Sequence, residues 1–270
     1  MKKHYLAKVF EPASIAVIGA SDSENSVGGQ VLQNLRNNGF KGPIYPVNPK
    51  HKKVQGLPAF GSVSAIDHPV DLAVIAIPPA AIPSVMHECG EHGVGAIIVI
   101  SAGFAETGTA GLALQNEIVD IARTYDIPLV GPNCLGIVRP RVGLNATFAK
   151  SPAKAGHVAL VAQSGAFCTA LLDWADTGGF GFSAVASLGA TADVGFGDVL
   201  DYLADEVLLR ESQEVQTFLL QTSILDRLCG PLCDAVRLAP TGQNSSQAIL
   251  EMLDRTNLFL VSLDEERRWY

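Results

Sequence analysis

Short apolar runs alternate with amphipathic segments over the first three quarters of the chain. The apolar runs cover residues 13–19, 43–48, 71–77, 95–101 and 128–131. Apolar residues recur at helical spacing over residues 31–39, 81–93 and 110–126, which predicts helices there. Nearly uninterrupted apolar strands joined by such helices are typical of a parallel sheet that is covered on both faces. The sequence therefore predicts an α/β fold that begins with a five-stranded, Rossmann-like domain over residues 1–140.

The same pattern restarts after residues 138–156, which we expect to form a linker. Strands are expected at 157–163 and 182–189, and helices at 164–177 and 195–206. This predicts the start of a second doubly wound α/β domain over residues 141–204. Because a sheet of only two strands is marginally stable, we expect this domain to pack on its neighbours or to expose an apolar edge that drives association.

The composition changes near Asp205. Of the 26 glycines, 24 precede this residue, and no lysine follows Lys154. Apolar residues at near-helical spacing predict a helix around residues 215–228. A second helix is expected after Ser246 as its N-cap, followed by an apolar strand at 258–263. Residues 205–270 are therefore expected to form a separate helical tail.

The bulk properties exclude several classes of protein. A net charge of −8 and a pI near 5.2 disfavour a general nucleic-acid binder. We find no signal peptide and no apolar stretch long enough to span a bilayer, so we expect no membrane partner. The five scattered cysteines favour a reduced, cytoplasmic protein. Cys229 and Cys233 fall one helical turn apart and are expected in a core rather than at a metal site.

The segment IAVIGASDSENSVGG, residues 15–29, predicts a phosphate-binding turn. An apolar strand ends at Gly19, and Gly28 and Gly29 open a helix. Glycines at such a turn let the backbone approach a phosphate that sits at the helix N-terminus. The strict G-x-G-x-x-G spacing is absent, so a tight turn without a ligand remains the alternative.

The end of the second expected strand narrows the choice of ligand. Proteins that bind NAD place an acidic residue there, whereas this chain has Asn48-Pro49-Lys50. A lysine suits an additional phosphate on the adenosine ribose, which coenzyme A and NADP carry and NAD does not. A solvated basic loop is the alternative, more for Lys52 and Lys53 than for Lys50. The chain has no G-x-x-x-x-G-K-[ST] motif, which excludes a P-loop ATPase.

Three further strand ends, at residues 77–79, 101–104 and 131–136, are expected to converge on the same crevice. Together with them, GASDSENSVGG, PIYPVNPK, VDLAVIAIPP, VISAGFAETG, GPNCLGI, LNATFA and LVAQSGA resemble the CoA-binding and first ligase domains of the NDP-forming acyl-CoA synthetases. Bacterial protein lysine acetyltransferases built on the same scaffold share these motifs. The resemblance covers about residues 6–205 and implies coenzyme A, or an acyl-CoA, rather than NADP. It also implies that the second domain is flavodoxin-like, as in succinyl-CoA synthetase.

The resemblance assigns binding positions one by one. The loop from Gly19 to Gly28 would wrap the pyrophosphate and adenosine, Lys50 would meet a phosphate, and Asn133 would lie towards the thiol. The complete set implied for the cofactor is Gly19, Ala20, Ser21, Ser26, Val27, Gly28, Asn48, Lys50, Ile77, Pro78, Ser101, Gly103, Phe104, Asn133 and Cys134. The implied phosphate loop, which in the synthetases receives the phosphate of a phosphohistidine, is Gln163, Ser164 and Gly165. For Cys134 itself we expect a small buried loop residue rather than a nucleophile.

The chain also departs from that family. The further strands of the second domain, its glycine-flanked phosphohistidine, the ATP-grasp module and the acyltransferase domain of the acetyltransferases are not found in this sequence. We therefore expect no catalytic residue, and a chain that binds CoA without making a thioester. The alternatives are a subunit of an ADP-forming acetate–CoA ligase completed by partner chains (an ATP-grasp subunit, or further copies in a homo-oligomer) and a non-catalytic sensor of CoA or acyl-CoA.

Residues 205–270 resemble a different family. The stretches VQTFLLQTSILDRLCGPLCDAV and ILEMLDRTNLFLVSLDEERRWY are similar to the helical, winged-helix-like segment of the large ATP-dependent LuxR-type regulators. The P-loop ATPase and the DNA-binding helix-turn-helix of those regulators are not found in this sequence. The chain thus resembles a join of two partial genes at residues 201–206.

Overall fold

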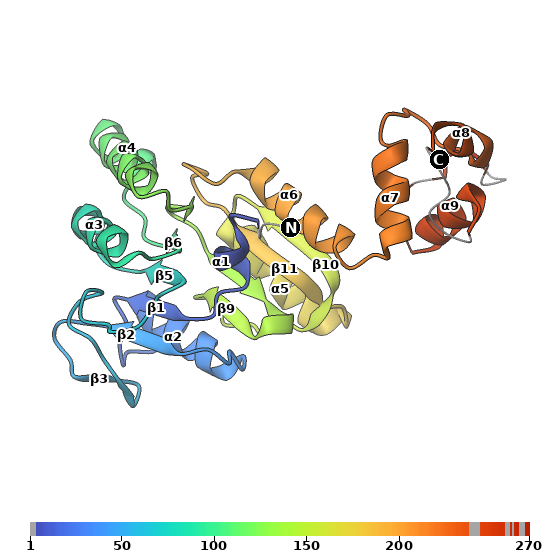
Figure 1. The fold of residues 1–270 in the computed structure, drawn as a ribbon. Helices are drawn as coiled ribbons and strands as arrows, with labels where there is room; N and C mark the ends of the chain where they lie inside the picture. The colour runs from blue at the N-terminus through green and yellow to red at the C-terminus, as the bar shows by residue number, and fades with distance from the viewer. Residues whose placement is uncertain (1–3, 238–243, 257–259, 261, 265–267) are drawn as a thin grey trace. The chain divides into compact units, whose positions relative to one another are not determined.

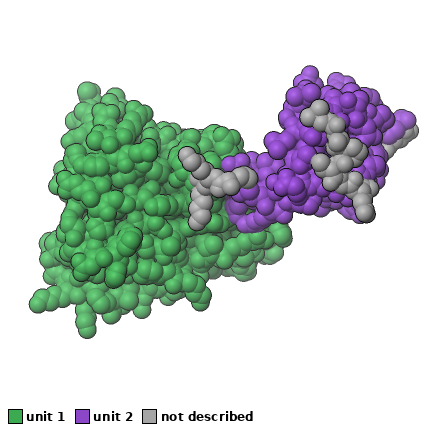
Figure 2. Space-filling view, viewed as in Figure 1, with its two compact units in different colours: residues 1–202 green, residues 203–270 purple. Residues whose placement is uncertain are grey.

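The computed structural model describes residues 4–237, 244–256, 260, 262–264 and 268–270. It divides into two compact units, Met1–Tyr202 and Leu203–Tyr270 (Figures 1 and 2). Within the described residues, no helix combines the length and the apolar character needed to cross a bilayer. The expected cytoplasmic location stays a prediction.

The first sheet of the first unit is five-stranded and entirely parallel, which confirms the predicted Rossmann-like architecture. Every residue of β1, β5 and β6 is buried, as expected for strands with helices on both faces. In spatial order the strands are β2 (Ile44–Val47), β1 (Ile15–Ile18), β5 (Leu72–Ile75), β6 (Ala96–Val99) and β7 (Leu129–Val130). The accompanying helices are α1 (Ala7–Phe10), α2 (Val27–Asn37), α3 (Ile82–His92) and α4 (Thr109–Thr124). A small hairpin, β3 (Lys53–Val54) and β4 (Leu57–Pro58), follows β2.

In the order β2-β1-β5-β6-β7, the chain adds β2 on one side of β1 and then crosses over to add β5 on the other side. Open α/β sheets bind ligands at the carboxyl ends of their strands, at such a switch point. Here the loop from β1 to α2 and the loop from β5 to the 3₁₀ turn η1 (Pro79–Ala81) leave neighbouring strands in opposite directions. The topology therefore creates a crevice where the sequence places its glycine-rich turn.

The expected linker at 138–156 is wrong, because this segment contains the end of one strand, all of a second and the start of a third strand of a second sheet. Two antiparallel strands, β8 (Gly136–Arg139) and β9 (Leu144–Thr147), flank the turn η3 (Pro140–Val142). The full sheet has the order β10-β11-β8-β9, with β10 (Ala155–Ala162) parallel to β11 (Phe182–Ser187). The proposed domain boundary at residue 140 thus falls between two paired strands. Helices α5 (Gly165–Gly178) and α6 (Phe196–Leu208) follow β10 and β11.

Buried polar side chains explain why the sequence of the β8–β9 hairpin predicts a linker. Arg139 is 1% exposed, and its Nη2 lies 3.3 Å from Oε1 of Glu11. Its guanidinium also lies over the ring of Tyr202, 6.0 Å from the centroid. On β9, Thr147 donates a hydrogen bond to Oδ1 of Asn145 (2.7 Å). Polar residues of this kind suggest an exposed segment, but tertiary partners allow their burial.

One buried asparagine joins the two sheets. Nδ2 of Asn34, on α2, donates to the carbonyl oxygens of Thr147 (2.7 Å) and Ala149 (2.8 Å). Helix α2 therefore covers the first sheet and also supplies a hydrogen-bond donor to two backbone carbonyls, one at the end of β9 and one just after it. The second domain packs on the first, as expected, although its sheet has four strands rather than the expected two.

The second unit is helical, with α7 (Gln213–Thr222), α8 (Gly230–Val236) and α9 (Ser246–Arg255) around a small core. The N-cap of α9 is Ser245, whose hydroxyl accepts from the N–H of Ala248 (3.2 Å), and not Ser246 as expected. Ser246 is instead the first helical residue, and its hydroxyl donates to Asp234. Cys233 is buried in this core. The expected strand at 258–263 lies largely outside the described residues.

Candidate functional site

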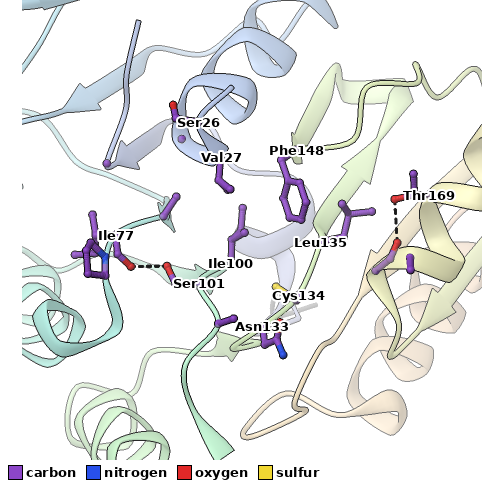
Figure 3. A pocket seen from close by; sticks show the side chains of 17 residues that line it. Ser26, Val27, Ile77, Ile100, Ser101, Asn133, Cys134, Leu135, Phe148 and Thr169 are labelled. Atoms are coloured by element: carbon purple, nitrogen blue, oxygen red, sulfur yellow. Dashed lines mark hydrogen bonds between the residues drawn. The ribbon is translucent and has the colours of Figure 1, made fainter. Parts of the chain in front are cut away.

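Three cavities lie at the carboxyl ends of the strands. The large cavity, about 690 Å³, is lined from both sheets (Figure 3). The side cavity, about 440 Å³, adjoins it and shares Gly19, Ile77 and Pro78 with it. The polar cavity, about 390 Å³, shares Asn133 and Gly165 with the large cavity.

Two glycines bring the β1–α2 turn to the large cavity. Gly19 has φ +90, and a Cβ atom built there would overlap the carbonyl oxygen of Ala76. A Cβ atom at Gly28 would overlap the carbonyl oxygen of Gly19. The end of β1, the end of β5 and the first turn of α2 therefore approach each other through backbone atoms alone, and both positions require glycine.

The N-terminus of α2 opens into the large cavity. Ser26 caps the helix: its hydroxyl accepts from the N–H of Gly29 (3.1 Å) and donates to the carbonyl of Ser23 (2.8 Å). The next two residues, Val27 and Gly28, line the cavity. Because N–H groups in the first turn have no partner within the helix, and the helix dipole is positive there, this position favours an anion.

The other strand ends converge as predicted and are hydrogen-bonded to one another. The hydroxyl of Ser101 donates to the carbonyl of Ile77 (2.6 Å), and the N–H of Asn133 donates to the carbonyl of Ser101 (3.0 Å). Asn133 has φ 56, a left-handed conformation that asparagine tolerates better than most residues. These bonds fix the wall of the large cavity opposite α2 (Figure 3).

Cys134 lines the same wall, but its thiol is not reactive. The side chain is buried, and Sγ donates to the carbonyl of Val99 (3.3 Å). Burial raises the pKa of the Cys134 thiol to about 12, so the thiol stays protonated at neutral pH. This agrees with the expected role as a small buried loop residue.

The second sheet supplies an apolar wall that sequence reasoning did not assign to the site. Phe148, just after β9, faces the large cavity near Val27 and Leu135 (Figure 3). Its motif, LNATFA, carries the resemblance, but the local sequence pattern around it predicts a linker. The other lining residues that were not singled out are small or apolar neighbours of motif residues: Ala76, Ile100, Ala102, Leu135, Ala166 and Thr169.

The side cavity contains the predicted basic residue. Lys50 lines it together with Asn48, whose Nδ2 donates to the carbonyl of Ala20 (2.8 Å) and whose Oδ1 accepts from the N–H of Lys50 (2.8 Å). Asn48 therefore joins the end of β2 to the β1–α2 turn. Glu88, which the sequence did not indicate, also lines this cavity. Burial opposes its ionisation, but hydrogen bonds from Ser64 outweigh this and lower the pKa of Glu88.

The polar cavity holds the predicted phosphate loop of Gln163, Ser164 and Gly165. Ser164 caps α5 and accepts from the N–H of Phe167 (3.2 Å). The loop faces Glu106, whose Oε1 accepts from the N–H of Gly103 (2.6 Å). Burial opposes ionisation of Glu106, but backbone N–H groups lower its pKa, so the carboxylate is charged at neutral pH.

Four of the implied positions line none of these cavities. Ala20 is buried behind the turn, and Ser21 accepts from the N–H of Ser23 within it (3.1 Å). Gly103 donates its N–H to Glu106. The side chain of Phe104 is completely buried in the core of the first sheet, so only its backbone is left to face a ligand.

Three family models match the chain. Residues 13–140 match the CoA binding domain, residues 155–210 match the succinyl-CoA ligase like flavodoxin domain, and residues 204–270 match the MalT winged helix domain. The two resemblances inferred from the motifs, before and after residue 205, are thereby confirmed.

Individual relatives cover the first three quarters of the chain. Over 201 residues it is 44% identical to an ADP-forming acetate–CoA ligase I of Archaeoglobus fulgidus, spanning 74% of this chain and 29% of the relative. Over 196 residues it is 42% identical to the alpha subunit of an ADP-forming acetate–CoA ligase II of Pyrococcus furiosus, spanning 73% and 42%. A solved structure of a dinucleotide-forming acetyl-coenzyme A synthetase 1 from Ca. Korarchaeum cryptofilum, in complex with phosphate and ADP, aligns with a TM-score of 0.71 and 38% identity, spanning 74% and 42%. The chain thus spans less than half the length of each relative.

Proposed function

Since the chain joins a CoA-binding domain and a succinyl-CoA ligase-like domain to a winged-helix segment, we propose that it binds coenzyme A or an acyl-CoA and makes no thioester by itself. The observation that carries this proposal is the pair of adjoining cavities at the switch point of the first sheet. The N-terminus of α2 lines the larger cavity next to Gly19, which both cavities share, and a lysine lines the smaller one. This layout fits a long ligand with phosphates in the middle and at one end.

The proposed pose follows the chemistry of the walls. The pyrophosphate lies at the N-terminus of α2, beside Ser26 and Gly28. The adenosine and its ribose phosphate occupy the side cavity, where Lys50 pairs with the phosphate. The pantetheine arm runs past Pro78 into the large cavity, between the apolar side chains of Val27 and Phe148. The thiol end lies towards Asn133.

Calorimetry with the full chain tests this proposal. We expect CoA and acetyl-CoA to bind with one-to-one stoichiometry, and NADP and ATP to bind more weakly, because neither carries a pantetheine arm to fill the large cavity. Tighter binding of NADP than of CoA would contradict the proposal. Absence of binding by all four ligands would contradict it as well.

The polar cavity is the reason why we expect no thioester formation by the chain alone. A phosphohistidine would have to reach Ser164 and Gly165 at the N-terminus of α5. None of the six histidines lines this cavity. His157, the histidine next to it on β10, precedes Gln163 by about 20 Å of extended strand. We therefore expect neither phosphoprotein nor acetyl-CoA from the purified chain with labelled ATP, acetate and CoA. An acid-labile phosphoprotein from the chain alone would contradict this.

A second candidate function is that of a subunit completed by a partner chain. The observation in its favour is the similarity to a separate alpha subunit in Pyrococcus furiosus. An added ATP-grasp protein that restored acetyl-CoA formation would establish this function, and CoA binding by the chain would be the same in both cases.

A further inference from the structure

The side cavity contains a carboxylate to which the proposed pose of CoA assigns no role. Glu88, on α3, is partly buried and lines this cavity together with Lys50. Burial opposes its ionisation, but hydrogen bonds lower the pKa of Glu88, so the side chain is negatively charged at neutral pH. A phosphate that bound beside Lys50 would be repelled by this second negative charge. A ligand that carries a phosphate therefore fits this cavity best if it presents a hydrogen-bond donor to Glu88.

Hydrogen bonds to a neighbouring loop fix the position of this carboxylate. Oε1 of Glu88 accepts from the N–H of Ser64 (2.8 Å) and from its hydroxyl (2.7 Å). The side chain of Ser62 donates a further hydrogen bond to Glu88. Helix α3 is thereby tied to the loop that follows β4, and the carboxylate is held before a ligand arrives. Binding to a group that is already ordered costs little conformational entropy.

The wall formed by Ser62 and Glu88 offers hydrogen-bond acceptors to the cavity. An ionised carboxylate has no donor, and the single proton of the Ser62 hydroxyl is engaged with Glu88. The other polar side chains in the described lining, Asn48 and Lys50, both lie at the end of β2. The rest of the described lining consists of glycine, proline and apolar residues, which suit a flat aromatic ring. The cavity thus combines one cation, an apolar lining and one wall of acceptors.

The nucleotide part of CoA carries two groups that can donate to such a wall. One is the free hydroxyl of the adenosine ribose, but it neighbours the ribose phosphate, so a carboxylate that met this hydroxyl would also meet the phosphate. The other is the exocyclic amino group of adenine, which the ring and the ribose separate from that phosphate. The amino group is therefore the donor that Glu88 can receive without charge repulsion.

We propose that Glu88 accepts a hydrogen bond from the amino group of adenine and thereby makes the side cavity selective for this base. The inference rests on the proposed binding of CoA and adds a specificity-determining residue to it. A site built to receive a donor disfavours an analogue that lacks one, because the acceptor is left without its partner. Since Glu88 is only partly buried, water replaces part of the lost bond, and we expect a difference in affinity of about tenfold.

Calorimetry with the full chain and two ligands tests the inference. The ligands are CoA and its purine analogue, in which a hydrogen atom replaces the amino group of adenine. The wild-type chain should bind CoA about tenfold more tightly than the analogue, and this comparison needs no variant to fold. Equal affinities would overturn the inference while leaving the proposed CoA binding intact. Absence of binding by CoA itself would contradict both.

Glu88→Gln tests whether Glu88 is the residue that distinguishes the two ligands. Glutamine keeps an oxygen for Ser64 but carries an NH₂ group in place of the other oxygen, so the preference for CoA should fall to about twofold or less. Glu91→Gln, the same change at an exposed position of α3, is the matched control and should keep the wild-type preference. If Glu88 only held the loop at Ser64, its variant would weaken both ligands equally and leave the preference unchanged, which would overturn the inference.

Discussion

The two strand–helix turns of the first unit, β1–α2 and β10–α5, are built from similar residues but are packed differently. In each, a serine caps the helix and a glycine lies in its first turn: Ser26 and Gly28 in one, Ser164 and Gly165 in the other. A Cβ atom at Gly28 would overlap a backbone carbonyl, whereas one at Gly165 would lie 3.1 Å from the side chain of Leu135. A methyl group has no room against the backbone at the first turn, whereas at the second turn it would make a tight contact with the Cβ atom of Leu135.

The strands that lead into these turns differ in burial. Every residue of β1 is buried between two parallel neighbours, and none of β10 is. The surroundings also differ in charge. The side cavity next to the first turn is lined by both Lys50 and Glu88, whereas the polar cavity at the second turn is lined by Glu106 without a basic residue among its described lining. We therefore expect the β1–α2 turn to bind an anion more tightly than the β10–α5 turn, which lacks a nearby basic side chain among the described lining residues.

The largest expected effect is that of adding a methyl group at the first turn. Gly28→Ala should lower the free energy of unfolding by about 3 kcal/mol, because the methyl group meets backbone that cannot rotate away. Gly165→Ala, the matched change at the second turn, should cost less, about 1 kcal/mol, because Leu135 has to move by only a few tenths of an ångström. Urea unfolding of both variants measures the difference. Equal losses of unfolding free energy in the two variants would show that the two turns are packed alike.

The next effect concerns the charge beside the first turn. Lys50→Ala should weaken CoA binding by about 1.5–3 kcal/mol, the range for a hydrogen bond to a charged group. Calorimetry with dephospho-CoA should show little loss, because that ligand lacks the ribose phosphate. Lys52→Ala, on the same loop, is the control. Equal weakening of both ligands would assign Lys50 to the pyrophosphate, and no effect on either would make it a solvated surface charge.

A third change tests the joint between the two sheets. Asn34→Ala leaves the buried carbonyls of Thr147 and Ala149 without their donor and should cost about 1–3 kcal/mol of stability. Asn37→Ala, at an exposed position of the same helix, should cost little. Hydrogen exchange should show the loss concentrated in β8 and β9. Uniform loosening of the first sheet instead would mean that α2 supports both sheets equally.

The smallest effect is the pH dependence at the second turn. Hydrogen bonds lower the pKa of Glu106 below the ordinary value of about 4.3. Their contribution to stability is therefore complete above that value and is lost as the pH falls through the lowered pKa. Glu106→Gln should reduce stability by about 0.5 kcal/mol at pH 7, with the difference shrinking below about pH 4. Thermal unfolding of both chains at pH 7 and below about pH 4 measures this effect, and an equal difference at both pH values would contradict the prediction.

Local sequence determined much of the first sheet and its site. Parallel strands buried on both faces leave an apolar signal that does not depend on their neighbours, so β1, β5 and β6 could be predicted. The glycines of the β1–α2 turn and the basic end of β2 likewise predict a phosphate-binding crevice, and the structure has cavities at both places. Both features act within a few residues of the chain.

Only the tertiary structure decided the second sheet and the walls of the site. The polar residues of β8 and β9, such as Arg139 and Thr147, are buried through partners that are remote in sequence, and local pattern cannot supply those partners. For the same reason Phe148 was not assigned to the cavity, and Phe104 was assigned to it although its side chain lies in the core. The apolar sequence of β10 resembles that of a central strand, yet in the described part of the chain β10 is the outermost strand of its sheet. Whether a strand is central or at an edge depends on which other strands reach it, and that is settled by topology rather than by its own residues.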